Sequence, residues 1–241
     1  MSEFKLPTEV VELPSKGLVY PESNPLSSGK VEMKYMTAKE EDILTNQAYI
    51  KDGTVLDKLL KSLIISKINY NDLVVGDKNA ILIASRILGY GSEYSFMYNG
   101  VEHTVDLATL ENKPFDESSV EKGVNNFTYT LPHSGLTITF KLLTHGDEGK
   151  VTREIQGYKK IDKNASPELT TRLKHMITSI DGNSEDKVIR DYIDNHLLAR
   201  DSRALREHIK QVQPDVDLTY TLDTGETVEV PINLSFFWPD A

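Results

Sequence analysis

Histidine and carboxylate side chains are the groups of this chain most able to do chemistry, but their spacing matches no catalytic or metal-binding pattern. Asp181-Gly182-Asn183 is similar to the start of a calcium loop. The later ligands of such a loop are missing, so we interpret this stretch as a turn. No two of the six histidines stand four residues apart beside a glutamate on one predicted helix. These histidines are His103, His133, His145, His175, His196 and His208. We therefore predict no catalytic, cofactor-binding or metal-binding residues.

Motifs and composition argue against several functional classes. The sequence has no phosphate-binding glycine loop, no dinucleotide fingerprint and no nucleophile elbow. Its many acids show no carboxylate pair of the kind a wall hydrolase needs. The chain has no cysteine, which excludes disulfides, thiolate chemistry and the common structural zinc sites. We predict that the protein is not an enzyme and has no cofactor or small-molecule ligand.

The charge and hydropathy of the chain also limit its partners. The net charge is −10 over 241 residues, which argues against general nucleic-acid binding. No apolar run approaches the roughly 20 residues that span a bilayer, so we expect no membrane insertion. The first residues lack the apolar region of a signal peptide, so we expect the protein to act where it is synthesised, in a cytoplasm.

Two groups of residues could bind another protein. Arg203 and Arg206 follow Asp201 at helical spacing, and their guanidinium groups could grip the carboxylates of a partner. Helix capping and surface ion pairs explain the same spacing without a partner. Near the end of the chain, Phe236, Phe237 and Trp238 are adjacent large aromatics, which either dock on their own domain or anchor in another subunit. These two arginines and three aromatics are our candidate partner-binding residues.

The elements that must position these residues occur in a repeated order. Lys34-Tyr-Met-Thr-Ala-Lys-Glu-Glu41 recurs as Lys141-Leu-Leu-Thr-His-Gly-Asp-Glu148. In each stretch a strand leads to a threonine at a helix N-cap, and acids follow in the first turn, where they suit the helix dipole. Leu60-Lys-Ser-Leu-Ile-Ile-Ser66 recurs as Leu173-Lys-His-Met-Ile-Thr-Ser179. The matches predict an internal duplication. The alternative is two independent α+β segments with the same generic capping chemistry.

Hydrophobic periodicity and turn residues predict an α+β fold of two related halves, each with a few helices packed on a small antiparallel sheet or hairpin. The predicted segments are an extended arm at 1–29, a first half at 30–110, an acidic linker at 111–126, and a second half at 127–241. In the first half we expect a strand at 30–36, helices at 37–49, from 54 and from 77, and a hairpin at 93–107. In the second half we expect a strand at 136–143, helices at 147–160, 167–179 and from 201, an extra helix near 184–198, and a hairpin at 217–234. Asp77 and Asp201 are the expected N-caps of equivalent helices.

Several stretches carry a resemblance to a known family. They are GLVYPESNPLSSGKVEMKYMTAKEEDILTN, DGTVLDKLLKSLI, RILGYGSEY, ITSIDGN, RDSRALRE and the terminal FFWP. Together they span nearly the whole chain and resemble T4-like bacteriophage baseplate hub assembly proteins. The resemblance implies a late protein of viral tail assembly that binds other tail and baseplate hub proteins. It would act in the host cytoplasm as an assembly factor, or remain in the virion as a component of the tail baseplate.

The resemblance also bears on metal binding. The two hairpins of relatives often carry Cys-x-x-Cys-Gly knuckles that would form a zinc ribbon. Here the matching turns read Phe96-Met-Tyr-Asn-Gly100 and Thr221-Leu-Asp-Thr-Gly225, which keep the glycines and lack every cysteine. We therefore expect degenerate, metal-free hairpins. Two alternative functions stay open: an assembly chaperone for the tape-measure protein, and, more remotely, a wall hydrolase of the tail tip.

Overall fold

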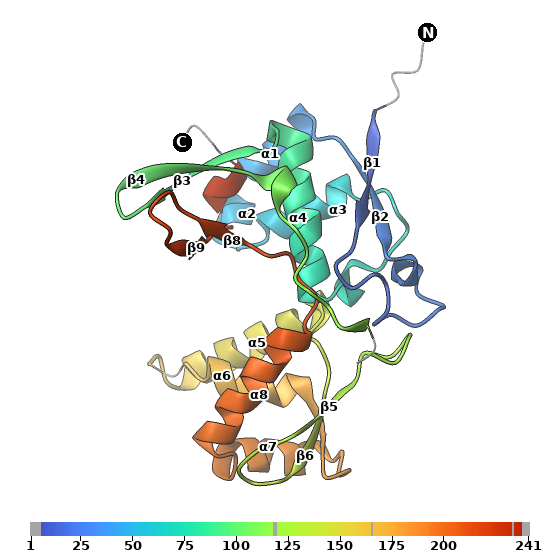
Figure 1. Ribbon diagram of the computed structural model, residues 1–241, viewed down its shortest axis with the longest axis vertical. Coiled ribbons are helices and arrows are strands. Elements are labelled where there is room, and N and C mark those ends of the chain that lie inside the picture. The colour runs from blue at the N-terminus through green and yellow to red at the C-terminus, as the bar shows by residue number, and fades with distance from the viewer. Residues whose placement is uncertain (1–5, 118–119, 165, 233, 238–241) are drawn as a thin grey trace.

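Two lobes make up the fold, and the chain leaves the first lobe, builds the second and then returns (Figure 1). The computed structural model describes residues 6–117, 120–164, 166–232 and 234–237. The first lobe contains β1–β4 and α1–α4, and the second contains β5–β7 and α5–α8. Strands β8 and β9 lie back on the first lobe. The α+β class predicted from the sequence is confirmed.

Within the stretch expected as an extended arm at 1–29, residues 6–29 pack as part of the first lobe. Strand β1 (Thr8–Glu12) pairs antiparallel with β2 (Lys30–Lys34). The short 3₁₀ helix η1 (Pro25–Ser28) follows Asn24, whose side chain accepts a hydrogen bond from the Leu26 amide. Leu26 is fully buried, and Leu13, Val19 and Tyr20 are also in the core. These apolar anchors hold the prolines and glycines of the segment in packed turns.

The helix expected at 37–49 is interrupted. Helix α1 (Ala38–Leu44) ends before Asn46, and that residue caps a new helix, α2 (Gln47–Lys51). The side-chain Oδ1 of Asn46 accepts hydrogen bonds from the backbone amides of Ala48 and Tyr49, which satisfies two amide donors of the first turn of α2. Helix α3 (Val55–Leu63) begins after Thr54, as predicted.

Helix α4 (Val75–Tyr90) begins earlier than expected, so Asp77 is not its N-cap. Asp77 lies in the first turn and is fully buried. Its carboxylate accepts hydrogen bonds from the Ser15 amide at 2.9 Å, the Ser15 hydroxyl at 2.6 Å and the Tyr20 hydroxyl at 2.6 Å. The residue that we predicted as a cap therefore binds the turn that follows Leu13.

The second lobe holds a three-stranded antiparallel sheet in the order β5-β6-β7, formed by Phe127–Thr130, Thr137–Phe140 and Ile177–Ile180. Its helices are α5 (His145–Ile161), α6 (Glu168–Met176), α7 (Asp186–Asn195) and α8 (Ala199–Val212). We had predicted a helix through residue 179, which is wrong after Met176. Ile177 instead pairs with Phe140 on β6, where both side chains are buried.

Asp201 is the counterpart of Asp77 in this lobe, and it is also not an N-cap. Helix α8 begins two residues before it, and Asp201 is fully buried. Its carboxylate accepts hydrogen bonds from the amides of His133 at 2.9 Å and Ser134 at 3.0 Å, in the turn after Leu131. Asp77 thus holds the turn after Leu13-Pro14, which precedes β2. Asp201 holds the turn after Leu131-Pro132, which precedes β6.

The repeated capping motif forms the same contacts in both lobes. Thr37 with Glu40, and Thr144 with Asp147, complete capping boxes at the starts of α1 and α5. Lys34 reaches Glu40 at 2.8 Å, and Lys141 reaches Asp147 at 2.7 Å. These boxes confirm the helix starts predicted from the sequence.

The two hairpins pack together on the first lobe. Strands β3 (Glu93–Tyr98) and β4 (Val101–Asp106) turn at Asn99-Gly100, as predicted. Strands β8 (Thr219–Thr221) and β9 (Thr227–Glu229) form the shorter hairpin. The Phe96 and Tyr220 rings meet edge to face at 6.1 Å, and the Tyr220 hydroxyl donates to the Thr104 carbonyl at 3.2 Å. The β8–β9 hairpin therefore packs on the first lobe, although its residues belong to the predicted second half at 127–241.

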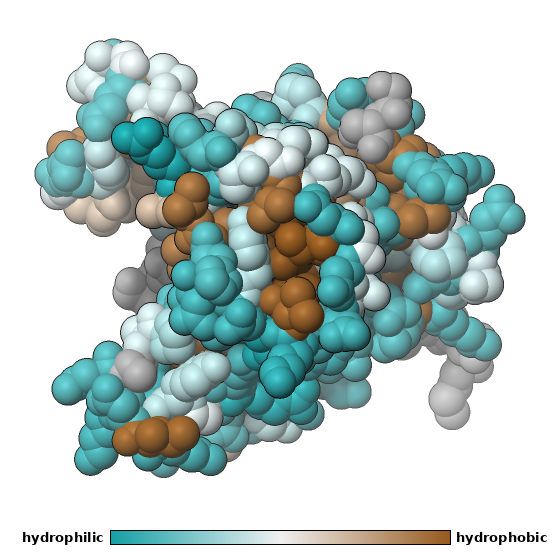
Figure 2. All heavy atoms as spheres, turned by 90° about the horizontal axis from the view of Figure 1, so that it is seen from below, coloured by the Kyte–Doolittle hydropathy of each residue, from teal (hydrophilic) through white to brown (hydrophobic). Residues whose placement is uncertain are grey.

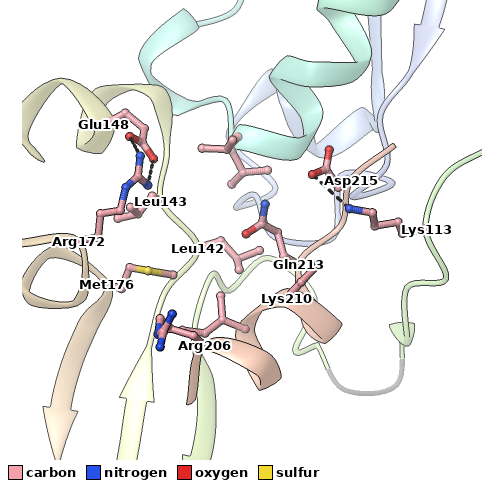
Figure 3. Close-up of a pocket in the computed structure, with 13 residues that line it drawn as sticks. Lys113, Leu142, Leu143, Glu148, Arg172, Met176, Arg206, Lys210, Gln213 and Asp215 are labelled. Carbon is pink, nitrogen blue, oxygen red and sulfur yellow. Dashed lines mark hydrogen bonds and ion pairs between the residues drawn. The ribbon is translucent and has the colours of Figure 1, made fainter. Parts of the chain in front are cut away.

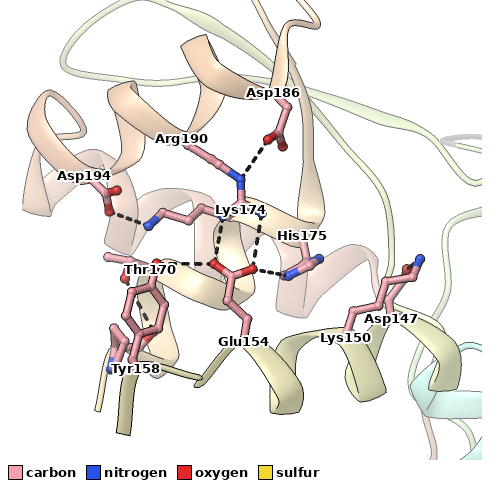
Figure 4. Close-up of polar contacts among 11 residues, drawn as sticks. Asp147, Lys150, Glu154, Tyr158, Thr170, Lys174, His175, Asp186, Arg190 and Asp194 are labelled. Carbon is pink, nitrogen blue, oxygen red and sulfur yellow. Dashed lines mark hydrogen bonds and ion pairs between the residues drawn. The ribbon is translucent and has the colours of Figure 1, made fainter. Parts of the chain in front are cut away.

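A cluster of charges joins three helices of the second lobe (Figure 4). Glu154 on α5 accepts from Arg190 on α7 at 2.8 Å and contacts His175 on α6 at 2.9 Å. Lys174 on α6, whose side chain is only 5% exposed, reaches Asp194 on α7 at 2.7 Å. The hydrogen bond from Arg190 is the main cause that lowers the pKa of Glu154 to about 2.

This cluster predicts acid sensitivity. The folded pKa of Glu154 lies below its ordinary value of 4.5, so its contribution to stability is present above pH 4.5 and is lost as pH falls towards about 2. Glu154→Gln is expected to destabilise the protein at pH 7 by about 1.5–3 kcal/mol and to flatten this acid limb. The matched control is Glu207→Gln, which removes an exposed pair with Arg203 and should change stability little. Urea unfolding between pH 2 and 7 measures both; equal pH profiles for Glu154→Gln and the wild type would contradict the assignment.

Candidate functional site: a cationic cavity between the lobes

The junction between the lobes is made by backbone hydrogen bonds near the starts of α4 and α5. The Val75 amide donates to the Leu143 carbonyl at 3.2 Å, and the His145 amide donates to the Leu73 carbonyl at 2.7 Å. An isolated β-bridge joins Val74 to Thr144. The first turns of two helices from different lobes are thus fixed side by side.

Two connecting segments lie beside this junction and pair with each other. The Lys113 amide donates to the Asp215 carbonyl at 2.8 Å, and the Asp217 amide donates to the Glu111 carbonyl at 2.7 Å. Part of the expected linker at 111–126 is therefore held in a short antiparallel ladder. The ladder brings Lys113 and Asp215 to the edge of the junction.

A polar cluster on the other side of the junction was not found by sequence reasoning. Asp57 on α3 accepts from Lys78 at 2.7 Å and from Tyr70 at 2.9 Å, and it lies 3.4 Å from the His145 ring. Burial, followed by the positive charge of Lys78, lowers the pKa of His145. The His145 ring packs edge to face on Tyr70 with ring centroids 4.6 Å apart. These contacts hold α5 against the first lobe.

A cavity of about 310 Å³ opens where the junction, the ladder and α8 meet (Figure 3). Its walls combine an apolar floor with charged groups from both lobes. The apolar lining residues are Val74, Val75, Leu142, Leu143, Met176 and Ile209. The polar ones are Lys113, Glu148, Arg172, Arg206, Lys210, Gln213 and Asp215. Four cations and two acids line the cavity, which gives it a positive balance in a chain of net charge −10.

Two of the four cations have acidic partners. Arg172 donates two hydrogen bonds to Glu148, at 2.7 and 2.8 Å, and Lys113 lies 3.8 Å from Asp215. Asp215 also accepts from Asn79 at 3.0 Å. Both acids of the cavity therefore already have a cationic partner.

The other two cations, Arg206 and Lys210, form no ion pair with any residue that the structure describes. They are exposed and stand one helical turn apart on α8. Arg206 uses its Nε–H to donate to the Ser202 carbonyl at 3.3 Å, which leaves its terminal guanidinium nitrogens free of any described acid. The arrangement is suited to an incoming carboxylate.

The candidate residues predicted from the sequence separate in space. Arg206 lines the cavity, but Arg203 does not, and it pairs instead with Glu207 at 2.8 Å on exposed α8 surface. Phe236 and Phe237 are fully buried within the first lobe. Trp238 lies outside the described residues. Lys210 was missed, although its spacing of four residues from Arg206 was a usable signal; nothing local in the sequence singles out Lys113 or Arg172.

Phe236 and Phe237 lie in the 3₁₀ helix η5 (Leu234–Phe237), not on a strand. Phe236 packs edge to face on Tyr94 at 4.8 Å. Its carbonyl accepts from the Nε–H of Arg86 at 2.8 Å, and the same guanidinium donates to the Gly91 carbonyl at 2.7 Å. In this arrangement both phenylalanines are core residues of their own chain.

Other sites have less to offer. Among the described residues no group of three or more histidines or acids could hold a metal ion. The described helices include none that is both long and apolar enough to cross a membrane. Figure 2 shows hydrophobic atoms gathered at the centre of the face seen from below, with hydrophilic atoms around them. Val188 and Leu198 in the second lobe are exposed apolar residues, at 38% and 53%. The cavity between the lobes combines an apolar floor with two cations, Arg206 and Lys210, that form no ion pair among the described residues.

Comparisons with protein-family models, with curated proteins and with solved structures find no match to this chain.

Proposed function

We propose that the protein is a baseplate hub component or hub assembly factor of a contractile phage tail, and that it acts by binding other tail proteins. One observation of the site supports a binding role above others: Arg206 and Lys210, which form no ion pair with a described residue, lie beside an apolar floor between the lobes. Apolar surface with a few placed charges is the usual composition of a recognition site. The resemblance to hub assembly proteins supplies the tail context.

We also propose that the two lobes descend from one duplicated unit. Three matched arrangements support this: the capping boxes with their lysines, the buried acids Asp77 and Asp201, and the strand pairing of the residue that follows α3 or α6. In the last, Met33 bridges to Ile64 in the first lobe and Phe140 pairs with Ile177 in the second. Superposition of residues 30–107 on 136–232 tests the proposal; unrelated settings for α3 and α6 would reject it.

The paired hairpins are, in this proposal, degenerate zinc-ribbon knuckles. Their packing through Phe96 and Tyr220 supports the idea, because it places the two turns on the same side of the lobe. Cysteines introduced at positions 96, 99, 221 and 224 are then expected to bind about one zinc ion per chain. Elemental analysis of that variant measures the outcome. The unchanged protein serves as the control, and a variant without zinc would contradict the proposed ancestry.

The chaperone alternative differs in fate, since a chaperone leaves before the virion is complete. The hydrolase alternative has less support, because both carboxylates of the cavity are already bound by cations, whereas a wall hydrolase needs two carboxylates that face its substrate. Asp77, whose pKa burial raises, is fully buried, accepts a hydrogen bond from Tyr20 and does not line the cavity.

Mass spectrometry decides among these roles. Tagged protein isolated from infected bacteria is expected to bring down baseplate hub proteins. Detection of the chain in purified particles would favour the structural component. Its absence from particles, with capture of the tape-measure protein, would favour the chaperone. Failure to capture any tail protein would reject the proposed function.

A further inference from the structure

We infer that the cavity between the lobes binds a polypeptide segment in which a side-chain carboxylate lies next to aliphatic side chains. This inference rests on the proposed function and names the chemistry of its partner at one site. Its evidence is the geometry of the cavity: two cations at the mouth, an apolar floor, and ion pairs on either side.

The cationic part selects a carboxylate. Arg206 and Lys210 lie at positions i and i+4 of α8, so their side chains project from the same face of the helix. The Nε–H of Arg206 is held by the Ser202 carbonyl, which orients the guanidinium and leaves its outer edge for a ligand. A guanidinium edge matches the two oxygens of a carboxylate, and the ammonium of Lys210 can add a second charge-assisted hydrogen bond.

The apolar part selects aliphatic neighbours of that carboxylate. Leu142, Ile209 and Met176 line the floor and are 1%, 6% and 9% exposed, whereas Val75, which lines the same cavity, is half-buried and offers more apolar surface to a ligand. In Figure 3, Met176 lies between the Arg172–Glu148 ion pair and Arg206, and Leu142 lies next to it. The volume of about 310 Å³ is at the lower end of the roughly 300–1,000 Å³ typical of ligand pockets. It suits one or two aliphatic side chains.

The surrounding charges exclude densely charged ligands. Glu148 and Asp215 flank the cavity, and the whole chain carries a net charge of −10. A nucleic acid would meet this field along its whole backbone, whereas one carboxylate meets only the local cations. An inorganic phosphate could use Arg206 but would leave the apolar floor empty. The combination therefore favours a sparse acidic, aliphatic segment of a protein.

Nuclear magnetic resonance of the full chain labelled at its methionine methyl groups can test this inference. Met176 lines the cavity, and Met97, 65% exposed on β3, is the internal control. The probe is the capped peptide acetyl-Gly-Leu-Glu-Leu-Gly-amide. It is expected to shift the Met176 signal in a saturable way and to leave Met97 unchanged. The same peptide with glutamine in place of glutamate should need a concentration about tenfold higher or more.

Variants separate the cavity from the rest of α8. Arg206→Met is expected to weaken peptide binding about tenfold or more, and Arg203→Met, on the same helix but outside the cavity, should leave it unchanged. No saturable shift at Met176, or equal binding by Arg206→Met, would overturn the inference. Sodium phosphate that reproduces the shift with the same Arg206 dependence would also overturn it, because the site would then be one for small anions. Capture of hub proteins alongside such a result would leave the proposed function standing; failure of wild-type capture would reject the function itself.

Discussion

Removal of residues 235–241 is expected to lower the melting temperature by about 10 °C or more. The deletion takes away Phe236 and Phe237, which are fully buried, and truncating one buried phenylalanine costs roughly 3–5 kcal/mol. In a chain of this length each kcal/mol corresponds to about 2–4 °C. The deletion also removes the carbonyl that accepts from buried Arg86, whose guanidinium would lose one of its partners. Calorimetry of the truncated protein measures the effect.

A shorter deletion is the matched control. Removing only residues 238–241 keeps both buried phenylalanines and takes away Trp238. We expect this protein to melt close to the wild type. Loss of hub-protein capture in this variant, with normal melting, would assign partner binding to Trp238. Normal melting of the longer deletion would contradict the core role of the two phenylalanines.

Gly76→Ala is expected to destabilise the junction of the lobes. A Cβ at this position would lie 1.8 Å from the Pro214 carbonyl oxygen and 2.9 Å from the Asp215 Cα, so backbone must move. Overpacking of this kind costs about 1–3 kcal/mol, or more where backbone cannot yield. Because Asp215 lines the cavity, the shift should also weaken peptide binding. Thermal melting and the Met176 titration measure the two consequences.

Gly149→Ala on α5 is the matched control for that substitution. Apart from the backbone of its own helix turns and its two chain neighbours, no heavy atom would lie within 4 Å of a Cβ at this position, and the residue lies inside a helix. Alanine in a helix interior is favoured over glycine by roughly 0.5–1 kcal/mol, so this variant should melt slightly higher than the wild type. If Gly76→Ala melted as high as Gly149→Ala, the close approach of α4 to residues 214–215 would be contradicted.

Local chemistry was the part of the fold that sequence reasoning could predict. The capping boxes at Thr37 and Thr144 and the Asn99-Gly100 turn depend on residues a few positions apart, and each was correctly predicted. Asn46 was missed because its cap competes with a helical pattern that continues beyond it. Strand β7 was missed because its isoleucines fit a helix as well as a strand, and only the pairing of Ile177 with Phe140 and of Ile180 with Ile138 makes them a strand.

Tertiary pairing could not be predicted from local pattern. Asp77 and Asp201 have the residue type of N-caps, and only the distant turns at Ser15 and His133 make them buried acceptors. The cavity joins the start of α4, the connector at Lys113 and the last turns of α8, which are far apart in the chain. Arg206 was found because helical spacing is a local signal. The apolar floor beside it was not found, because its residues come from distant segments of the chain.

The most direct test of a tail-protein binding role for the cavity is quantitative co-purification from infected bacteria. Tagged wild type, Arg203→Met and the double variant Arg206→Met with Lys210→Met are compared at equal expression and equal melting temperature. We predict that wild type and Arg203→Met retain the same baseplate hub proteins. The amount of hub protein recovered with the double variant should be lower by about tenfold or more, because two charge-assisted contacts are removed. Equal recovery by the double variant, or no hub protein with the wild type, would contradict the account.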